Sequence, residues 1–147
     1  MNTRGSLVGE RILLTLWVGG LWTVGYLVAP VLFANLDDRA LAGTLAGTLF
    51  RILGWIGLVA GALLLAANQM RQPGLRGNWR ALVLLAMLAL VAAGQFGLAP
   101  VIAALREAGL ADGSRFALLH GIASVLYLAT SLLGLALVAA GPPEAAA

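Results

Sequence analysis

The sequence predicts an all-α membrane protein, a bundle of four transmembrane helices, and three observations lead to this fold class. Of the 147 residues, 61% are hydrophobic and only 10% are charged, against about 45–50% and about 25% in an average soluble domain. Four long apolar segments follow one another, and none alternates as a half-buried strand does. Because a water-soluble monomer could not cover so much apolar surface, hydrocarbon must surround most of the chain.

The four segments are each long enough to cross a bilayer. A helix needs about 20 apolar residues because each residue rises about 1.5 Å through a core about 30 Å thick. The sequence predicts a single domain over residues 1–141 and a disordered tail at 142–147. Its helices are expected at about residues 12–34, 40–68, 79–108 and 115–140.

The connections carry residues that begin and end helices. Short polar side chains are favoured at the N-cap, and glycine is favoured just after the last turn. We expect N-caps at Asp37 and Asp38, at Asn78, and at Asp112 or Ser114. Gly109 and Gly141 are expected to end the third and fourth helices, and the third helix should continue through Pro100 with a kink there.

The arginines predict how the bundle lies in the membrane. The net charge of +3 includes nine arginines and no lysine, spread through the connections. The side of the two termini holds Arg4, Arg11, Arg71, Arg76 and Arg80, and the other side holds Arg39, Arg51, Arg106 and Arg115. Since arginine is enriched in cytoplasmic loops, we expect both termini in the cytoplasm. Scattered arginines indicate contacts with membrane lipids and give no basis for nucleic-acid binding.

Four side chains from different helices are predicted to lie at one depth. Tyr26 and Gln95 are each fifteen residues beyond an arginine of the terminal side, or roughly 22 Å along a helix. His120 and Trp55 lie about 7 Å and about 6 Å inside the opposite boundary. This layer falls in the outer third of the membrane, beneath Arg51.

The fourth helix carries a polar stripe, because His120, Ser124, Tyr127 and Ser131 recur at i, i+4, i+7 and i+11. Such side chains turn inward in hydrocarbon, either to join helices or to line a site. The stripe therefore has two possible roles. Its side chains hydrogen-bond helices to one another, or His120 binds a ligand or transfers a proton. The candidate ligand-binding residues are Tyr26, Arg51, Gln95, His120, Ser124 and Tyr127.

Two of these candidates have a plainer interpretation. Arg51 either snorkels to the headgroups or points inward, where it would attract an anion or hold Asp38 or Glu107. Gln95 either hydrogen-bonds a neighbouring helix or contacts a ligand.

Glycines are expected to let helix backbones approach closely. The positions assigned to helix packing are Gly19, Gly54, Gly57, Gly61 and Gly121. Homodimerisation through the G-x-x-x-G pair at Gly57 and Gly61 is the alternative.

Several chemistries have no support in the sequence. The chain has no cysteine and one histidine, so a thiolate site, a bis-histidine haem and a zinc site lack ligands. His120 and Ser124 lie one turn apart on one helix with no third residue to orient a base, which argues against a hydrolase. We expect no metal, no cofactor and no enzymatic activity.

Short motifs along the chain, taken together, resemble a known family. They are Leu16-Trp17-Val18-Gly19-Gly20, Pro30-Val31-Leu32-Phe33, Leu36-Asp37-Asp38-Arg39, Leu49-Phe50, Pro100, Phe116 and His120-Gly121-x-x-Ser124. Over about residues 8–140 the chain is similar to the transmembrane protein 205-like family, whose bacterial members carry domain of unknown function 4149. The resemblance implies a four-helix domain of the bacterial inner membrane with undetermined biochemistry, and a eukaryotic relative associated with resistance to platinum drugs.

A more distant likeness is to the membrane domain of copper-resistance proteins. Met1, Met70 and Met87 are the only soft sulfur ligands, and none is expected near His120, which argues against copper transport. The stretch from Gln95 to Pro100 also lacks an acidic residue that the eukaryotic form is expected to have there.

The leading hypothesis is a non-enzymatic membrane protein that binds or passes a small solute or ion through an outward-facing polar pocket, contributing to tolerance of toxic compounds. The alternative is a structural or accessory subunit that forms a homo-oligomer or docks another membrane protein. A membrane-embedded enzyme or electron carrier is a third and weaker hypothesis.

Overall fold

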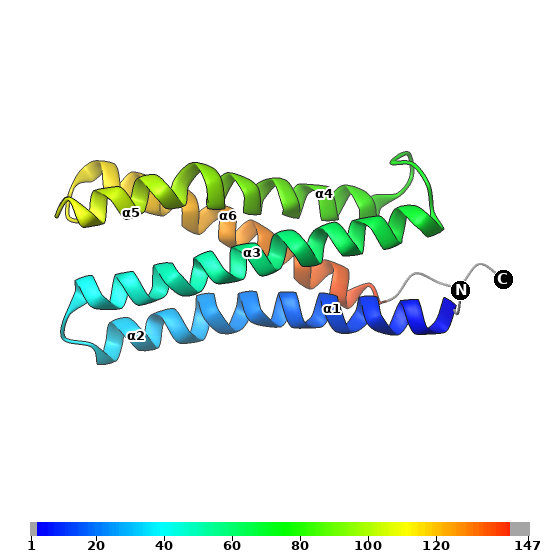
Figure 1. The fold of residues 1–147 in the computed structure, drawn as a ribbon, viewed down its shortest axis with the longest axis horizontal. Coiled ribbons are helices and arrows are strands. Elements are labelled where there is room, and N and C mark those ends of the chain that lie inside the picture. The colour runs from blue at the N-terminus through cyan, green and yellow to red at the C-terminus, as the bar shows by residue number, and fades with distance from the viewer. Residues whose placement is uncertain (1–2, 142–147) are drawn as a thin grey trace.

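Four long helices, each reversing the direction of the last, make up the computed structural model, which describes residues 3–141 (Figure 1). The first consists of α1 (Thr3–Thr23), the π-helical turn η1 (Val24–Val28) and α2 (Ala29–Asn35); the second is α3 (Arg39–Arg71); the third consists of α4 (Trp79–Ala92), the π-helical turn η2 (Ala93–Leu98) and α5 (Ala99–Glu107); and the fourth is α6 (Ser114–Ala139). The predicted tail at 142–147 lies outside the described residues.

The spans that are long and apolar enough to cross a membrane are Leu7–Asn35, Arg39–Arg71, Trp79–Glu107 and Ser114–Ala139. They confirm the predicted all-α, four-helix membrane fold. The first helix begins several residues earlier than the apolar pattern indicated, because the polar residues before Ile12 continue the helix.

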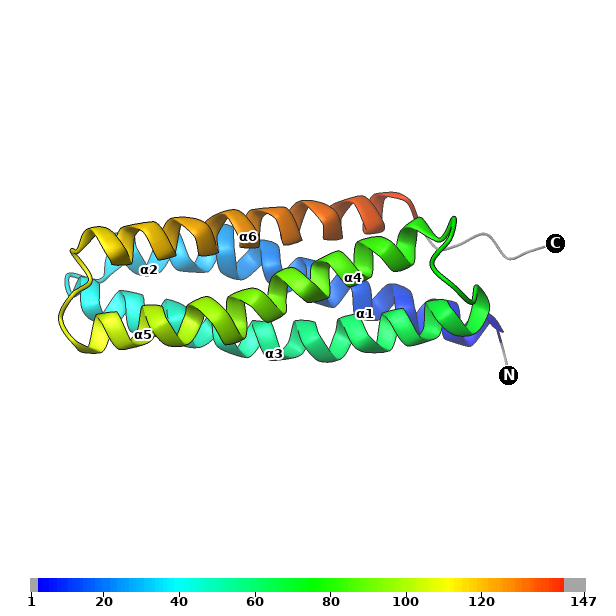
Figure 2. The same cartoon turned by 90° about the horizontal axis from the view of Figure 1, so that it is seen from above.

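The helices form a ring in which each contacts its neighbours along the chain: α1 lies beside α3 and α6, and α4 lies beside the same two helices (Figures 1 and 2). The start of α1, the α3–α4 connection and the end of α6 share one end of the bundle, which we call the terminal end. The connections at residues 36–38 and 108–113 form the distal end.

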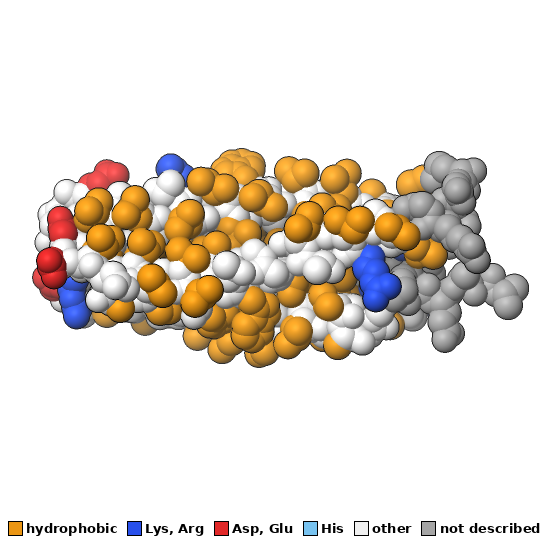
Figure 3. Space-filling model, turned by 90° about the horizontal axis from the view of Figure 1, so that it is seen from below, with side chains coloured by type: hydrophobic (Ala, Val, Ile, Leu, Met, Phe, Trp, Pro, Cys, Tyr) orange, Lys and Arg blue, Asp and Glu red, His pale blue; other side chains and the backbone are white. Residues whose placement is uncertain are grey.

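The centre of the bundle is apolar. Trp17, Met87 and Leu137 are fully buried there, packed with Val18 and Leu84. Large hydrophobic side chains also cover the outside of the helices, and on the face in Figure 3 they occupy the middle while charged groups lie toward the ends. This distribution is that of a bundle surrounded by lipid.

Both π-helical turns directly precede an Ala-Pro pair. The N–H of Ala29 bonds to the carbonyl of Val24, and the N–H of Ala99 bonds to the carbonyl of Gly94. Proline at positions 30 and 100 has no N–H to donate to the preceding turn, and the wider turn absorbs the mismatch. The third helix therefore runs through Pro100 as predicted, with a π-helical turn before it.

The helix ends match most of the expected caps. The side chain of Asp38 accepts bonds from the N–H groups of Ala40 and Leu41 at 2.8 and 3.1 Å, and Asn78 caps α4. The expected cap at Asp112 or Ser114 is wrong, because Gly113 occupies the N-cap of α6 without a side-chain bond. Asp37 is likewise not a cap.

Gly109 and Gly141 end their helices as predicted. Their φ angles are +72° and +69°, in the left-handed region where glycine is favoured.

Candidate functional site

Two of the candidate ligand-binding residues, Tyr26 and Tyr127, meet where the first, second and fourth helices come together. The ring centroids of Tyr26 and Tyr127 are 6.1 Å apart, and Phe50 packs edge-on to Tyr127 at 5.0 Å. The hydroxyl of Tyr127 donates to the backbone carbonyl of Leu21 at 2.6 Å. A Cβ on Gly25 would lie 2.3 Å from Cε1 of Tyr127, so glycine is required for this contact. Tyr127 thus ties α6 to the first helix beside its π-helical turn.

Replacing Tyr127 with phenylalanine is expected to lower the unfolding free energy by about 0.5–1.5 kcal/mol, because one part-buried hydrogen bond is lost while the ring packing is kept. The measurement is equilibrium unfolding in mixed micelles. Tyr26→Phe is the matched control, since Tyr26 is the more exposed residue and its hydroxyl makes no hydrogen bond to the described residues. Equal stability of the two variants would contradict this role of Tyr127.

Gln95 joins the third helix to the second. Its Nε2 donates to the backbone carbonyl of Arg51 at 3.1 Å. Its amide lies over Gly54, where a Cβ would come within 2.4 Å of Oε1. The side chain of Arg51 is exposed. This geometry favours Gln95 as a link between helices, with the Arg51 backbone as its partner.

His120 and Ser124 lie on the exposed side of α6. The hydroxyl of Ser124 donates to the carbonyl of His120 at 2.9 Å within the same helix. The His120 ring stacks on Phe116 at 5.8 Å, and the Arg106 guanidinium lies 5.6 Å from the Phe116 ring. The structure therefore does not gather these two residues with Tyr26 and Gln95.

The polar stripe divides because α6 crosses the bundle at an angle (Figure 1). Toward the terminal end α6 lies against α1, and Ser131 is buried there. Toward the distal end α6 lies beside α5 and η2 but not α2. One face of this helix thus meets different surroundings along its length.

Three of the five assigned glycines allow close packing. A Cβ on Gly57 would come within 2.6 Å of Nε1 of Trp17, and one on Gly61 within 2.7 Å of a methyl carbon of Leu88; Gly54 faces Gln95. Gly19 and Gly121 are exposed, and a Cβ on either would meet no atom within 4 Å. The expected close packing at these two positions is not found within the described chain.

The short duplication of Ala-Gly-Thr-Leu at residues 42–49 has a structural role that the sequence did not reveal. Its glycines, Gly43 and Gly47, lie under the Arg106 side chain, and a Cβ on them would come within 3.1 Å of Nε and 3.2 Å of Nη1 respectively. The two glycines form a flat seat for this guanidinium. Arg106 thereby holds α3, α5 and α6 together at the distal end.

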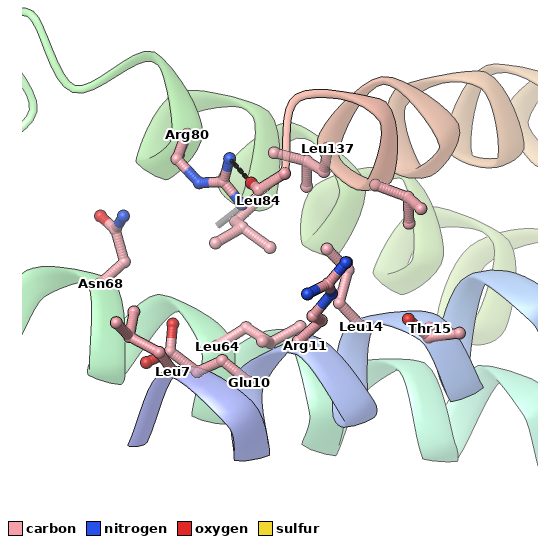
Figure 4. A pocket seen from close by; sticks show the side chains of 12 residues that line it. Leu7, Glu10, Arg11, Leu14, Thr15, Leu64, Asn68, Arg80, Leu84 and Leu137 are labelled. Atoms are coloured by element: carbon pink, nitrogen blue, oxygen red, sulfur yellow. Dashed lines mark hydrogen bonds between the residues drawn. The ribbon is translucent and has the colours of Figure 1, made fainter. Parts of the chain in front are cut away.

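A cavity of about 170 Å³ opens at the terminal end, among all four helices (Figure 4). It is lined by Leu7, Glu10, Arg11, Leu14, Thr15, Leu64, Asn68, Arg80, Leu84, Leu137, Val138 and Gly141. The side chains of Arg11 and Arg80 approach it from opposite sides in Figure 4. We call it the terminal cavity.

Among the described residues at the terminal cavity, positively charged side chains outnumber negatively charged ones. Glu10 forms a two-pronged ion pair with Arg71, in which Nη2 and Oε2 are 2.5 Å apart. The carboxylate is thus offset by an arginine outside the lining. Arg80 donates one bond, from Nη1 to the carbonyl of Gly141 at 2.8 Å. Its remaining donors and the guanidinium of Arg11 leave two positive groups at the opening.

Asn68 of the cavity lining is hydrogen-bonded to a second buried asparagine, Asn78. Nδ2 of Asn78 donates to Oδ1 of Asn68 at 2.8 Å and to the carbonyl of Gln72 at 3.0 Å. Oδ1 of Asn78 accepts from the N–H of Ala81 at 3.1 Å. These bonds fix the α3–α4 connection, which carries Arg71 and Arg80 at its two ends.

Sequence reasoning treated the charges of the terminal end as topology signals and missed this cavity. The available signal was Glu10, an acidic residue at the edge of an apolar segment, together with three arginines on the same side that have no acidic neighbour in sequence. In the structure Glu10 pairs with Arg71, although the two residues are 61 positions apart in the sequence.

The charged groups do not form a metal site. Within residues 3–141, no three His, Asp or Glu side chains lie close enough together to hold an ion. The donors that converge on the terminal cavity are guanidinium groups, which bind anions.

Comparison with known proteins identifies the family. The sequence profile of one family, described as a domain of unknown function (DUF4149), matches residues 12–111. The chain belongs to the DUF4149 family. No significant match to a curated protein or to a solved structure was found. In this DUF4149 protein the match covers most of the first helix and all of the second and third, and it includes half of the residues that line the terminal cavity, among them Arg80.

Proposed function

We propose that this protein is a non-enzymatic, multi-pass protein of the bacterial inner membrane that binds a small anionic group in its terminal cavity. With both termini in the cytoplasm, the cavity opens on the cytoplasmic face. This proposal keeps the predicted solute-binding role and moves the site from the distal layer to the opposite end of the bundle.

The observation that carries the proposal is the pairing of Arg11 and Arg80 across one cavity (Figure 4). Arginine stays charged and presents a planar set of donors that matches carboxylate and phosphate oxygens. Arg80 is partly buried, so its charge is screened less than one on an open surface. An anion bound in the cavity would also neutralise the positive charges of Arg11 and Arg80.

The size of the cavity limits the ligand. Sites for drug-sized molecules measure about 300–1,000 Å³, whereas this one measures about 170 Å³. A single phosphate or carboxylate with a small substituent is the class that fits. Binding such a compound would link the protein to toxic-compound tolerance, which predicts that wild type restores tolerance to a deletion strain and Arg80→Gln does not.

Inorganic phosphate is the probe for anion binding. A ligand specific for the folded state raises the unfolding free energy by about 2.7 kcal/mol at 100 times its Kd. We expect phosphate to stabilise the purified wild type in detergent. Arg80→Gln and Arg11→Gln should each weaken binding about tenfold or more, because a charge-assisted contact contributes about 1.5–3 kcal/mol. Glutamine at position 80 can still donate to Gly141, which protects the fold.

Arg39→Gln is the matched control. Arg39 is exposed at the distal end, so its loss should leave phosphate binding unchanged. Equal weakening in all three variants would point to nonspecific charge screening and contradict the site.

A structural or accessory subunit is the alternative function. It is supported by the exposed glycines Gly19 and Gly121, which leave room for a helix of another chain. If this alternative holds, Arg11→Gln and Arg80→Gln should keep every interaction that the wild type makes. Anion binding requires instead that these two variants lose affinity for the anion.

A further inference from the structure

We propose that the anionic group bound in the terminal cavity is the phosphate of a membrane lipid, which enters sideways between α1 and α6. This inference rests on the proposed function and specifies its ligand. Free phosphate would offer the same oxygens to the arginines, so the argument depends on the rest of the cavity.

The lining repeats one arrangement in all four helices. Each helix places a polar group at the rim and a leucine four residues deeper toward the bundle centre. The pairs are Glu10 with Leu14, Asn68 with Leu64, Arg80 with Leu84, and the carbonyl of Gly141 with Leu137. Four residues of helix correspond to about 6 Å. The terminal cavity therefore has a polar rim, which includes Arg80, and an apolar floor, an arrangement that suits an amphiphile whose anionic head contacts the arginine.

The rim lies at the depth of lipid headgroups. Arg80 is the second residue of α4, beside the exposed Trp79, whose ring lies 5.4 Å from the Arg80 guanidinium. Tryptophan and arginine side chains at helix ends are typical of the membrane interface. Basic pockets between transmembrane helices at this level bind lipid headgroups.

The cavity is closed on one side and open on the other. Its lining residues from α3 and α4 include Leu64, Asn68 and Leu84, each at most 5% exposed. Those from α1 and α6 include the exposed residues Arg11, Thr15 and Val138. A ligand can therefore reach the arginines from the lipid between α1 and α6.

The volume of the terminal cavity limits which parts of the lipid can enter it. About 170 Å³ holds a phosphate and the first atoms of its glycerol, but no complete acyl chain. The chains would remain in the bilayer along α1 and α6, where Thr15 and Val138 border the opening.

Three probes that share parts of one molecule test this inference on the full-length protein in mild detergent. They are dioctanoyl phosphatidic acid, dioctanoylglycerol, which has the same chains without phosphate, and inorganic phosphate. We expect phosphatidic acid to bind at least about tenfold more tightly than inorganic phosphate, since burial of a few methylene groups suffices for that factor. Dioctanoylglycerol should bind at least about tenfold more weakly than phosphatidic acid, because it lacks the charge that the arginines recognise.

Val138→Phe narrows the opening between α1 and α6. It should lower the affinity for phosphatidic acid at least about fivefold and leave the affinity for inorganic phosphate unchanged. Val125→Phe is the matched control, an exposed valine of the same helix outside the terminal cavity, and it should bind both probes as wild type does.

The outcomes separate the two proposals. Equal affinity for phosphatidic acid and inorganic phosphate, both lowered by Arg80→Gln, would overturn the lipid inference and leave the anion site intact. Binding of dioctanoylglycerol as tight as that of phosphatidic acid would overturn the lipid inference alone. The absence of any phosphate or phosphatidic acid binding that depends on Arg80 would overturn both proposals.

Discussion

Replacing Gly57 with alanine is expected to destabilise the bundle by about 1–3 kcal/mol, the usual cost of adding a methyl group to a filled core. The new Cβ would lie 2.6 Å from Nε1 and 3.0 Å from Cε2 of Trp17. Trp17 is 1% exposed and is held among Leu53, Met87 and other core side chains, so its ring cannot swing away. Leucine at position 57 should prevent the first two helices from packing.

Gly19→Ala is the control for this prediction. Gly19 lies on the same first helix as Trp17, is exposed, and has no atom within 4 Å of its Cβ position. Alanine there should be neutral or stabilising by up to about 1 kcal/mol, because it favours the helix. The free energy of unfolding in mixed micelles is the measurement. A Gly57→Ala protein as stable as Gly19→Ala would show that this packing is not rigid.

Asn78→Ala is expected to lower the unfolding free energy by about 2–4 kcal/mol, the combined cost of a lost helix cap and an unsatisfied buried group. Asn78 is 2% exposed and is both the N-cap of α4 and the donor to Asn68 and Gln72. Alanine would leave Oδ1 of Asn68 without this donor. The loosened α3–α4 connection should also weaken phosphate binding, because it carries Arg80.

Two variants separate the roles of Asn78. Asn78→Asp keeps an acceptor for the N–H of Ala81 but brings a carboxylate against two oxygen acceptors, so it should be at least as unstable as Asn78→Ala. Asn35→Ala removes an exposed asparagine whose side chain bonds, among the described residues, to the carbonyl of Val31 in its own helix at 2.9 Å, and should cost no more than about 0.5 kcal/mol. Equal unfolding free energies for the alanine variants at positions 35 and 78 would refute this assignment.

The sequence predicts the fold well because one quantity, the length of the apolar segments, decides it. Four runs of sufficient length leave helices across a bilayer as the only way to pair the backbone. Asp38 and Asn78 also mark their helix starts correctly. The side chain of a cap bonds to its own helix, so its role depends on a few neighbouring residues alone.

The candidate site was harder to predict because it depends on how helices cross. Counting residues placed Tyr26, Gln95 and His120 at one depth, but depth does not specify the side of a helix that faces inward. The angle of α6 separates His120 from Tyr127, although both lie on one stripe of that helix. Glu10 and Arg71 meet only because the first two helices are antiparallel neighbours, a long-range fact that local patterns do not contain.

The π-helical turns have a consequence for how the bundle can vary. Each residue of an α-helix advances by about 100° around the axis, and a turn that takes in an extra residue absorbs one such step. The stripe that α1 presents to lipid therefore does not continue along α2, and the same holds for α4 and α5. Each of these helices consists of two segments whose orientations are set separately. Substitutions that reshape the lipid-facing surface near Pro30 or Pro100 therefore require no matching change in the half of the bundle that surrounds Arg11 and Arg80.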